Sequence, residues 1–332
     1  MSELRQDPIT SEWVIVSPGR AARPKDPHGN EPASCPFCPG NEALTGEAID
    51  QMLRPDGRWQ VRAVANKFPL LASASEEPAA APLATAGGLL LAGNGAHEVI
   101  VETPDHRGHL GTMPVADARQ ALAMYVRRYR ALASHSRQYA QVVLFRNHGE
   151  RAGTSLAHPH AQIAAVPVVS PVVRRRVASQ VAYFDTHRGC GTCDALQREL
   201  QQRDRVVLQS AEFVSVAPFA AAAPYQLHVI PRRHAAGFAD VDDGALDDLA
   251  QHLTRLLAAL RAAAADPDYN LVVLSAPLDL VHRRATHWII DIRPRLSTPA
   301  GFEFGAGIAV NSQLPEAAAQ LMRAALRAGQ AH

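Results

Sequence analysis

The alternation of apolar and polar residues predicts the same series of elements twice along the chain. Each half begins with two segments that alternate as β-strands do, and then has an amphipathic stretch with Asp near its start and apolar residues at helical spacing. The predicted strands are 59–69, 97–106, 212–224 and 225–234, and the predicted helices are 116–136 and 242–265.

Each predicted helix leads to a third strand, a loop and a fourth strand that carries histidine. These strands are predicted at 140–149 and 156–168 in the first half and at 269–277 and 286–296 in the second, and 169–188 is predicted as a helical connection. Repetition of a whole series of elements indicates a duplicated module. We therefore predict an α+β fold of two tandem modules, 1–172 and 173–332, each an antiparallel sheet with flanking helices, packed as one pseudo-twofold unit.

Composition places the chain among globular proteins and narrows its partners. Hydrophobic residues make up 47% of the 332 residues, and 33 basic residues nearly balance 32 acidic ones, so there is no broad positive charge for nucleic acid or an anionic membrane. The N-terminus lacks the apolar core of a signal peptide, and the most apolar run, 82–93, is too short to span a bilayer. A cytoplasmic location is the resulting expectation.

All four cysteines fall into two C-x-x-C pairs, each accompanied by two histidines at matching places in its half. His158 follows His106 by 52 residues, and His287 follows His234 by 53. Two thiolates and two imidazoles suit structural zinc, whereas redox-active pairs or simply buried thiols are the alternatives. The predicted ligands are Cys35, Cys38, His106 and His158 in the first site, and Cys190, Cys193, His234 and His287 in the second, where His228 and His282 are rival ligands.

Residues 153–163, GTSLAHPHAQI, carry two histidines and a glutamine at alternating positions. On an extended strand His158, His160 and Gln162 point the same way, with successive pairs about 6.5–7 Å apart. If His158 binds zinc, His160 is an imidazole beside a rigid anchor. A neutral histidine can attack phosphorus when one ring nitrogen is held by an acceptor and the other presents its lone pair. Gln162 could then donate to a phosphoryl oxygen.

The loop before these histidines, RNHGERAGTS at 146–155, has the makings of a phosphate-binding loop. It offers backbone N–H groups and two hydroxyls, which are the usual donors to phosphate. The residues concerned are Gly149, Gly153, Thr154 and Ser155.

The second half keeps the predicted metal histidine and loses the predicted nucleophile. His287 stands where His158 stands, but Ile289 replaces His160 and Asp291 replaces Gln162. We therefore expect one active module and one catalytically silent copy.

Taken together, these motifs resemble the galactose-1-phosphate uridylyltransferase family within the histidine-triad superfamily, nearly from end to end. The H-P-H-x-Q segment is the most specific part of the resemblance. The similar segments are DPITSEWVIVSPGRAARP (7–24), CPFCPGNE (35–42), ANKFP (65–69), NHGERAGTSLAHPHAQ (147–162) and HWIIDIRPRLSTPAGFEFGAGIAVN (287–311).

The resemblance implies histidine-triad-like modules, zinc, and a homodimer in which the C-terminal sugar segment completes the partner's site. It also implies that His160 attacks the α-phosphorus of a nucleotide sugar, that Gln162 and Ser155 stabilise the phosphoryl oxygens, and that a sugar 1-phosphate then takes the nucleotidyl group. The other implied contacts are Arg20 and Arg23 to the diphosphate, Asn66 and Asn147 near the nucleoside and phosphates, and Glu303 near the sugar hydroxyls.

Two departures from the classical pattern bear on the substrate. The chain has SLA before the first histidine and Ala161 before the glutamine, and its second metal set contains C-x-x-C. Both features resemble the ADP-glucose phosphorylase branch, in which the base can be adenine and the acceptor inorganic phosphate. The leading hypothesis is UDP-glucose:galactose-1-phosphate uridylyltransferase. The alternatives are a nucleotide-sugar phosphorylase or adenylyltransferase, and a zinc-stabilised nucleotide-binding protein without turnover.

Overall fold

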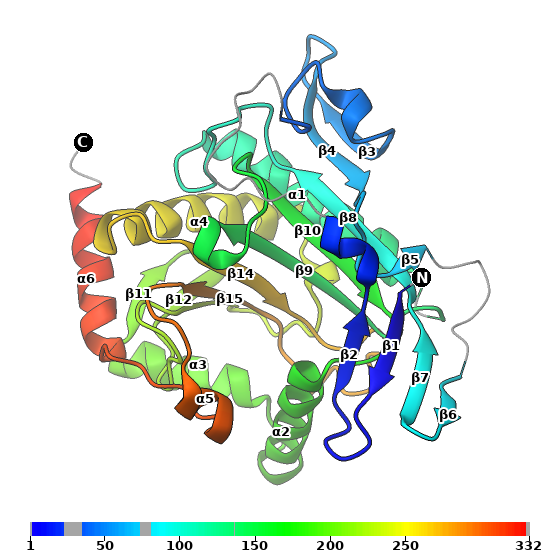
Figure 1. Cartoon of the computed structure of the whole chain (residues 1–332). Coiled ribbons are helices and arrows are strands. Elements are labelled where there is room, and N and C mark those ends of the chain that lie inside the picture. Colours follow the sequence, from blue (N-terminus) through cyan, green and yellow to red (C-terminus); the bar gives the residue numbers. More distant parts are fainter. Residues whose placement is uncertain (1, 23–34, 74–80, 136, 330–332) are drawn as a thin grey trace.

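The computed structural model describes residues 2–22, 35–73, 81–135 and 137–329, which form one large sheet, a small sheet and the surrounding helices (Figure 1). In the large sheet, neighbouring strands follow the order β11-β12-β13-β15-β14-β9-β10-β8-β4-β3, all antiparallel, and β5 adds to β8 in parallel. Its strands are β3 (Ala48–Leu53), β4 (Trp59–Ala65), β5 (Ala72–Ser73), β8 (Asn94–Val101), β9 (Gln141–His148), β10 (His160–Val166), β11 (Val206–Gln209), β12 (Phe213–Val216), β13 (Leu227–Pro231), β14 (Tyr269–Leu274) and β15 (Ile289–Pro294).

The large sheet has an internal pseudo-twofold symmetry about its centre. Outward from the central pair, β9-β10-β8-β4-β3 corresponds to β14-β15-β13-β12-β11. The registers correspond as well: Ala161 faces Ile100 as Ile290 faces Val229, both shifted by 129 residues (290 − 161 and 229 − 100). This symmetry confirms the predicted α+β fold of two tandem modules packed as one unit.

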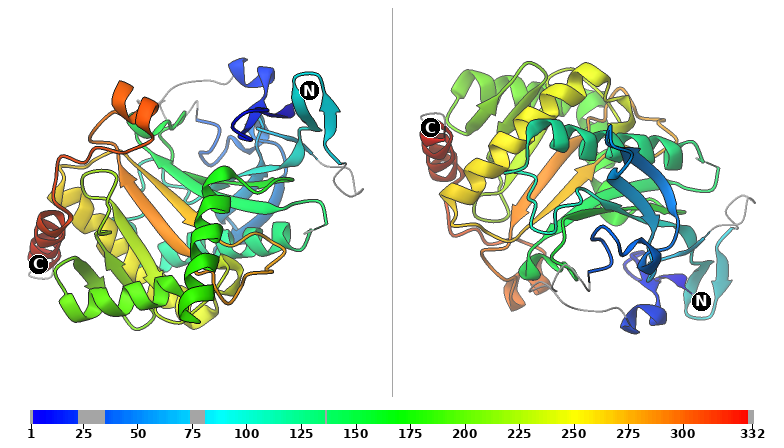
Figure 2. Two further views of the ribbon diagram at one scale, coloured as in Figure 1. Left: turned by 90° about the horizontal axis from the view of Figure 1, so that it is seen from below. Right: turned by 90° about the horizontal axis from the view of Figure 1, so that it is seen from above.

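Helices α1 (Val115–Ala133) and α4 (Asp243–Ala263) lie together against one face of the large sheet (Figure 2). The first turn of α4 is capped by the Asp242 side chain, which accepts from Ala245 N at 2.9 Å. Beneath the helices lie alternate residues of β10, Ala161 and Ile163, which are almost fully buried in the main core. Because side chains alternate along a strand, the residues between them face the opposite side of the sheet.

The remaining elements lie around this framework. The helices are α2 (Pro171–His187), α3 (Gly191–Gln202), α5 (Gly301–Ala306) and α6 (Pro315–Ala328), with the 3-10 turns η1 (Pro18–Ala22), η2 (Glu42–Leu44), η3 (Glu150–Ala152) and η4 (Phe238–Asp240). The small sheet has the order β2-β1-β7-β6, formed by β1 (Glu3–Gln6), β2 (Trp13–Val16), β6 (Leu83–Thr85) and β7 (Gly88–Ala92). Within the described ranges, no helix has the length and apolar character needed to cross a membrane.

A buried charged cluster joins the two modules where β9 pairs with β14. The Arg146 guanidinium lies 2.9 Å from the Glu102 carboxylate and donates to the Tyr269 hydroxyl at 3.0 Å. All three side chains are almost inaccessible to solvent. Removing either charged side chain would leave the other buried without its partner, and the hydrogen bond to Tyr269 links this ion pair to the second module.

The strand predicted at 156–168 begins later than expected. The ladder with β8 starts at His160, which faces Val101, while His158 lies in a bend before the strand. Pro159 explains the difference because it has no N–H to donate to a ladder. The expectation that His158 shares the strand face of His160 and Gln162 is therefore wrong, whereas the alternation of the latter two is observed.

Candidate functional site

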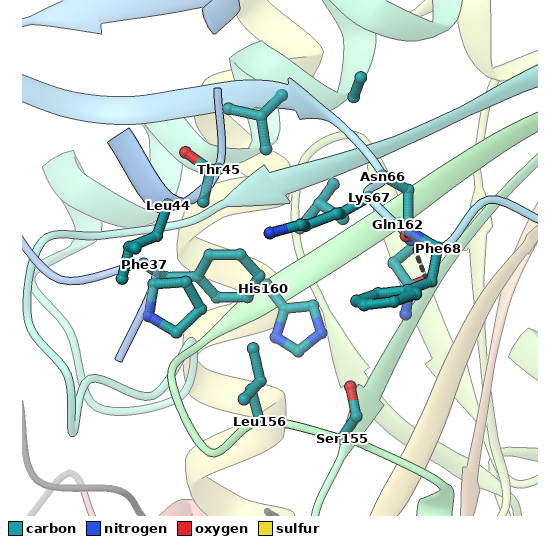
Figure 3. A pocket seen from close by; sticks show the side chains of 14 residues that line it. Phe37, Leu44, Thr45, Asn66, Lys67, Phe68, Ser155, Leu156, His160 and Gln162 are labelled. Carbon is teal, nitrogen blue, oxygen red and sulfur yellow. Dashed lines mark hydrogen bonds between the residues drawn. The ribbon is translucent and has the colours of Figure 1, made fainter. Parts of the chain in front are cut away.

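A cavity of about 340 Å³ opens on the sheet face opposite α1 and α4 (Figure 3). Much of its wall is apolar, and polar side chains converge on it from β10 and the neighbouring turns. The apolar side chains include Phe37, Leu44, Val64, Val99 and Leu156, and the polar ones include Asn66, Lys67, Ser155, His160 and Gln162. An apolar slot with a few convergent polar groups has the chemistry to hold a base beside a phosphate.

His160, the first residue of β10, presents its imidazole in this cavity with one ring nitrogen already held. Nδ1 lies 2.8 Å from the His158 carbonyl oxygen, which can only accept, so the neutral ring carries its proton on Nδ1. The lone pair is then on Nε2, the nitrogen suited to attack an electrophile. The ring centroid lies 5.2 Å from that of Phe37, and only 5% of the residue is exposed.

Gln162 lies two residues further along the same face, in a cluster of three polar side chains. Its Oε1 is 3.0 Å from His97 Nε2 and 3.4 Å from Asn66 Nδ2. Figure 3 shows Asn66 and Gln162 side by side at the edge of the cavity. Gln162 is 4% exposed and His97 6%, so the contacts are shielded from water.

The glycine loop between β9 and β10 is held from the second module. Gly149 has φ +84°, and a Cβ there would lie 1.8 Å from Asp268 Oδ1, so only glycine fits. Ser155 lines the cavity, as the sequence suggested, whereas Gly153 and Thr154 do not. Gly153 adopts the left-handed conformation that ends the η3 turn.

All four metal ligands predicted in the first half come together beside this loop. Cys38 Sγ lies 3.3 Å from His106 Nδ1 and 3.5 Å from His158 Nδ1, and Cys35 Sγ lies 3.7 Å from His158 Nδ1. The other ring nitrogen of His158 lies 2.8 Å from the Thr103 carbonyl oxygen. Such an outer hydrogen bond fixes the orientation of a ligating imidazole.

The second set assembles in the same way, with one difference. Cys193 Sγ lies 3.5 Å from His234 Nδ1 and 3.3 Å from His287 Nδ1, and Cys190 Sγ lies 3.9 Å from His287 Nδ1. In the described part of the chain, however, the buried Nε2 of His287 has no hydrogen-bond partner. Of the rival ligands, His228 lies 3.5 Å from Asp291, and His282 is outside the cluster.

Both donor sets fit a tetrahedral divalent ion. Bonds of about 2.3 Å to sulfur and about 2.0–2.1 Å to nitrogen place the two atoms about 3.6 Å apart in a tetrahedron. The sulfur–nitrogen distances here run from 3.3 to 3.9 Å. Burial and the neighbouring Cys35 raise the pKa of the Cys38 thiol to about 11, and burial lowers the pKa of His158 to about 4. A cation would therefore replace a tightly held thiol proton beside an imidazole that is already neutral.

The corresponding place in the second module is filled by an arginine. Arg176 of α2 donates to the His287 carbonyl oxygen at 3.2 Å, as His160 Nδ1 donates to the His158 carbonyl. Ile289 stands at the strand position of His160 and is buried. This module therefore lacks the imidazole, and the carbonyl oxygen that would orient it is occupied by Arg176.

Of the two arginines predicted to meet a diphosphate, Arg20 lies within the described residues. Arg20 donates from Nη1 to the Phe68 carbonyl oxygen at 2.6 Å, so it supports the turn that carries Phe68 into the cavity wall. Arg23 lies outside the described residues.

Asn147 and Glu303 do not line the cavity of their own chain. Asn147 lies on β9, one position beyond the Ala161–Arg146 pair, and its Oδ1 accepts from Asn270 Nδ2 at 2.8 Å. Glu303 lies on α5, where its carboxylate accepts from Ala300 N at 3.0 Å and caps the helix.

Sequence reasoning missed His97, Phe37 and Lys67. The alternation of HEVIVETP places His97 and Val99 on one strand face, and this was the available signal for His97. Phe37, between the two cysteines, and Lys67, after Asn66, gave no such signal.

The chain matches two protein-family models. The model described as galactose-1-phosphate uridyl transferase, N-terminal domain, matches residues 1–170, and the corresponding C-terminal domain matches residues 176–288. Among curated proteins, an ADP-glucose phosphorylase from Arabidopsis thaliana is 35% identical over 331 residues, covering 97% of this chain and 92% of its own length. A galactose-1-phosphate uridylyltransferase from Thermotoga maritima is 28% identical and covers 97% and 98%.

The comparison with solved structures finds the same two kinds of protein. The crystal structure of an ADP-glucose phosphorylase from A. thaliana with bound ADP-glucose superposes with a TM-score of 0.78 at 33% identity, covering 97% of this chain and 99% of that one. A uridylyltransferase structure superposes with a TM-score of 0.81 at 29% identity, covering 98% and 99%.

Proposed function

We propose a function for this chain on the basis that it belongs to the galactose-1-phosphate uridylyltransferase family. It moves a nucleoside monophosphate from a nucleotide sugar to a phosphate-bearing acceptor through a covalent bond to His160. The family consists of nucleotidyltransferases. The observation that carries the proposal is the His160 imidazole, buried at the cavity wall with Nδ1 held by the His158 carbonyl oxygen. A protein that only binds nucleotide has no need of a histidine oriented in this way.

In the first half-reaction, His160 Nε2 forms a bond to the α-phosphorus while the bond to the bridging oxygen breaks. Sugar 1-phosphate leaves, and the ring becomes a cationic nucleotidyl-imidazolium. The Nδ1–H to carbonyl hydrogen bond then strengthens because its donor is charged. Gln162 and Ser155 donate to the non-bridging oxygens, and the apolar wall around Phe37 holds the base.

In the second half-reaction, a phosphate oxygen of the acceptor attacks the same phosphorus. The bond to His160 Nε2 breaks, and the imidazole returns to its neutral state. Inorganic phosphate as acceptor gives a nucleoside diphosphate, whereas a sugar 1-phosphate gives a new nucleotide sugar. With either acceptor one bond to phosphorus forms as another breaks, and the overall reaction follows ping-pong kinetics.

ADP-glucose with inorganic phosphate is the first candidate substrate pair. It is supported by the 35% identity to an ADP-glucose phosphorylase over nearly the full length of both chains. UDP-glucose with galactose 1-phosphate, the leading hypothesis from sequence, is the second candidate. It is supported by the full-length match to the T. maritima uridylyltransferase.

Labelling with α-³²P nucleotide sugars decides between the candidates. We expect ADP-glucose to leave an acid-labile, base-stable label on the protein, and inorganic phosphate to discharge it as ADP. A label from UDP-glucose that galactose 1-phosphate alone discharges would favour the second candidate. If neither nucleotide sugar labels the protein, the covalent mechanism is wrong.

We also propose zinc as the ion of both cysteine–histidine sets. Donor types and sulfur–nitrogen distances support it, and zinc prefers closed tetrahedral sites of this composition. The ion would hold the bend at His158 and thereby the carbonyl that orients His160. The second module, 173–332, would be a silent copy, in keeping with Ile289 and the Arg176 contact to His287.

A homodimer in which Glu303 serves the partner's cavity is a further part of the proposal. The segment around α5 exposes large apolar side chains, with Phe302 60% and Phe304 79% accessible, which suggests an interface. We expect sedimentation at about twice the mass of one 35.7 kDa chain. Phe302→Ser with Phe304→Ser should sediment as a monomer, while Ile9→Ser, at a residue that is even more exposed (91%) but remote in sequence, should not. A wild-type monomer would refute the dimer.

A further inference from the structure

We propose that His97 is a positioning residue that holds the Gln162 amide in a single orientation, with its N–H groups facing the reacting phosphate; this inference rests on the proposed function. Gln162 can serve a phosphoryl oxygen only through Nε2, because its Oε1 would repel the negative charge. An unconstrained amide could rotate and present either atom. The structure contains the contacts that select one orientation.

The tautomer of His97 follows from its own backbone anchor. Its Nδ1 lies 3.0 Å from the backbone nitrogen of Leu70, which is a donor, so Nδ1 must accept. A neutral imidazole that accepts at one nitrogen carries its proton on the other. His97 Nε2 therefore donates, and its acceptor is Gln162 Oε1 at 3.0 Å.

Asn66 is oriented in the same manner and points to the same atom. Its Oδ1 accepts from the backbone nitrogen of Phe68 at 2.8 Å, so its Nδ2 is a donor. That Nδ2 lies 3.3 Å from His97 Nε2 and 3.4 Å from Gln162 Oε1, and because His97 Nε2 already carries a proton, Gln162 Oε1 is the one of the two that can accept. Two donors, each fixed by a different backbone N–H, thus converge on one oxygen. Reversing the Gln162 amide would set its N–H groups against both of them, so Nε2 is left to face the cavity.

The second module contains an independent copy of this arrangement. By register, Gln226 occupies the place of His97 and Asp291 the place of Gln162, both shifted by 129 residues (226 − 97 and 291 − 162). Gln226 Oε1 accepts from the backbone nitrogen of Ala222 at 2.6 Å, and its Nε2 donates to Asp291 Oδ1 at 2.8 Å. Gln226 therefore accepts from a backbone N–H and donates to the neighbouring strand residue, as His97 does.

The two modules also show why this device matters only in the first. Asp291 is a carboxylate with two equivalent acceptor oxygens, so it gains no new orientation from its donor. Gln162 has chemically different ends, and the donor decides which of them the substrate meets. His97 thus converts an ambiguous side chain into a directed hydrogen-bond donor without touching the substrate.

The first test measures the tautomer directly and needs no activity. In protein labelled with ¹⁵N-histidine, we expect the signal that disappears in His97→Gln to carry its proton on Nε2. The signal lost in His160→Ala should carry its proton on Nδ1 instead. A proton on Nδ1 of His97 would overturn the proposal, whatever the substrate proves to be.

The second test separates positioning from packing. In a single-turnover labelling experiment, His97→Leu should slow formation of the nucleotidyl-protein by roughly 10- to 100-fold, while the dissociation constant for the nucleotide sugar changes little. His97→Gln should restore most of the rate because it keeps both the acceptor and the donor. In a Gln162→Ala background, His97→Leu should have no further effect.

Several outcomes contradict the inference. They are a wild-type rate in His97→Leu, a His97→Gln variant as slow as His97→Leu, and independent effects of His97→Leu and Gln162→Ala. If the wild-type protein takes no label from either nucleotide sugar, the proposed function fails, and the tautomer measurement still decides the role of His97.

Discussion

His160→Ala should abolish covalent labelling and lower turnover by on the order of 10⁴-fold or more, because it removes the only attacking atom of the proposed mechanism. The cavity should keep its affinity for the nucleotide sugar, since the apolar wall and the phosphate donors remain. We therefore expect the variant to take no label and still to bind the nucleotide sugar with wild-type affinity. It is measured by α-³²P transfer and by equilibrium binding of the same nucleotide sugar.

His187→Ala is the matched control, because His187 is an exposed histidine at the end of α2. It should label at the wild-type rate and bind substrate equally well. Persistence of the label in His160→Ala would exclude His160 as the nucleophile. Loss of substrate binding together with labelling would indicate instead that the substitution has damaged the cavity.

Cys35→Ser should release one metal equivalent, lower the melting temperature by roughly 10 °C or more, and slow labelling at the same time. The free energy of metal binding contributes to folding because no site exists in the unfolded chain. Labelling should fall because the proposed metal would hold His158, whose carbonyl oxygen lies 2.8 Å from His160 Nδ1. Metal content, circular dichroism and the single-turnover rate together check the prediction.

Cys190→Ser makes the same chemical change in the second module, which we propose to be catalytically silent. It should release the other metal equivalent and lower stability, but keep the labelling rate within about threefold of wild type, because, among the described residues, none of its four candidate ligands lines the cavity. We also expect this second ion to leave first on titration with a chelator, since His287 lacks the outer hydrogen bond that His158 makes. Equal loss of activity in the two variants would contradict the division into an active and a silent module.

The sequence was most informative where chemistry repeats along the chain. The 52- and 53-residue spacings predicted both sets of four metal-binding candidates, which the structure brings together. The positions of His160 and Gln162 on one strand face followed from alternation alone. The late start of β10 was missed because the effect of Pro159 on the ladder outweighed the apparent continuity of the strand.

Contacts between distant residues that leave no repeated pattern in the sequence could not be predicted. The tautomer of His97 is set by Leu70, 27 residues away, and its acceptor Gln162 is 65 residues away. Nothing in the sequence indicated that Arg176, a residue of the predicted connecting helix, contacts the His287 carbonyl oxygen. Local periodicity predicts which face a side chain occupies, but not which partner it meets there.

Peptide mapping by mass spectrometry tests the central claim most directly. The protein would be incubated with ADP-glucose or UDP-glucose without acceptor, quenched at alkaline pH and digested. We predict a nucleoside monophosphate on the peptide that contains His158 and His160, with fragment ions placing it on His160. An adduct on another residue, or continued turnover with no adduct at any residue, would contradict the account.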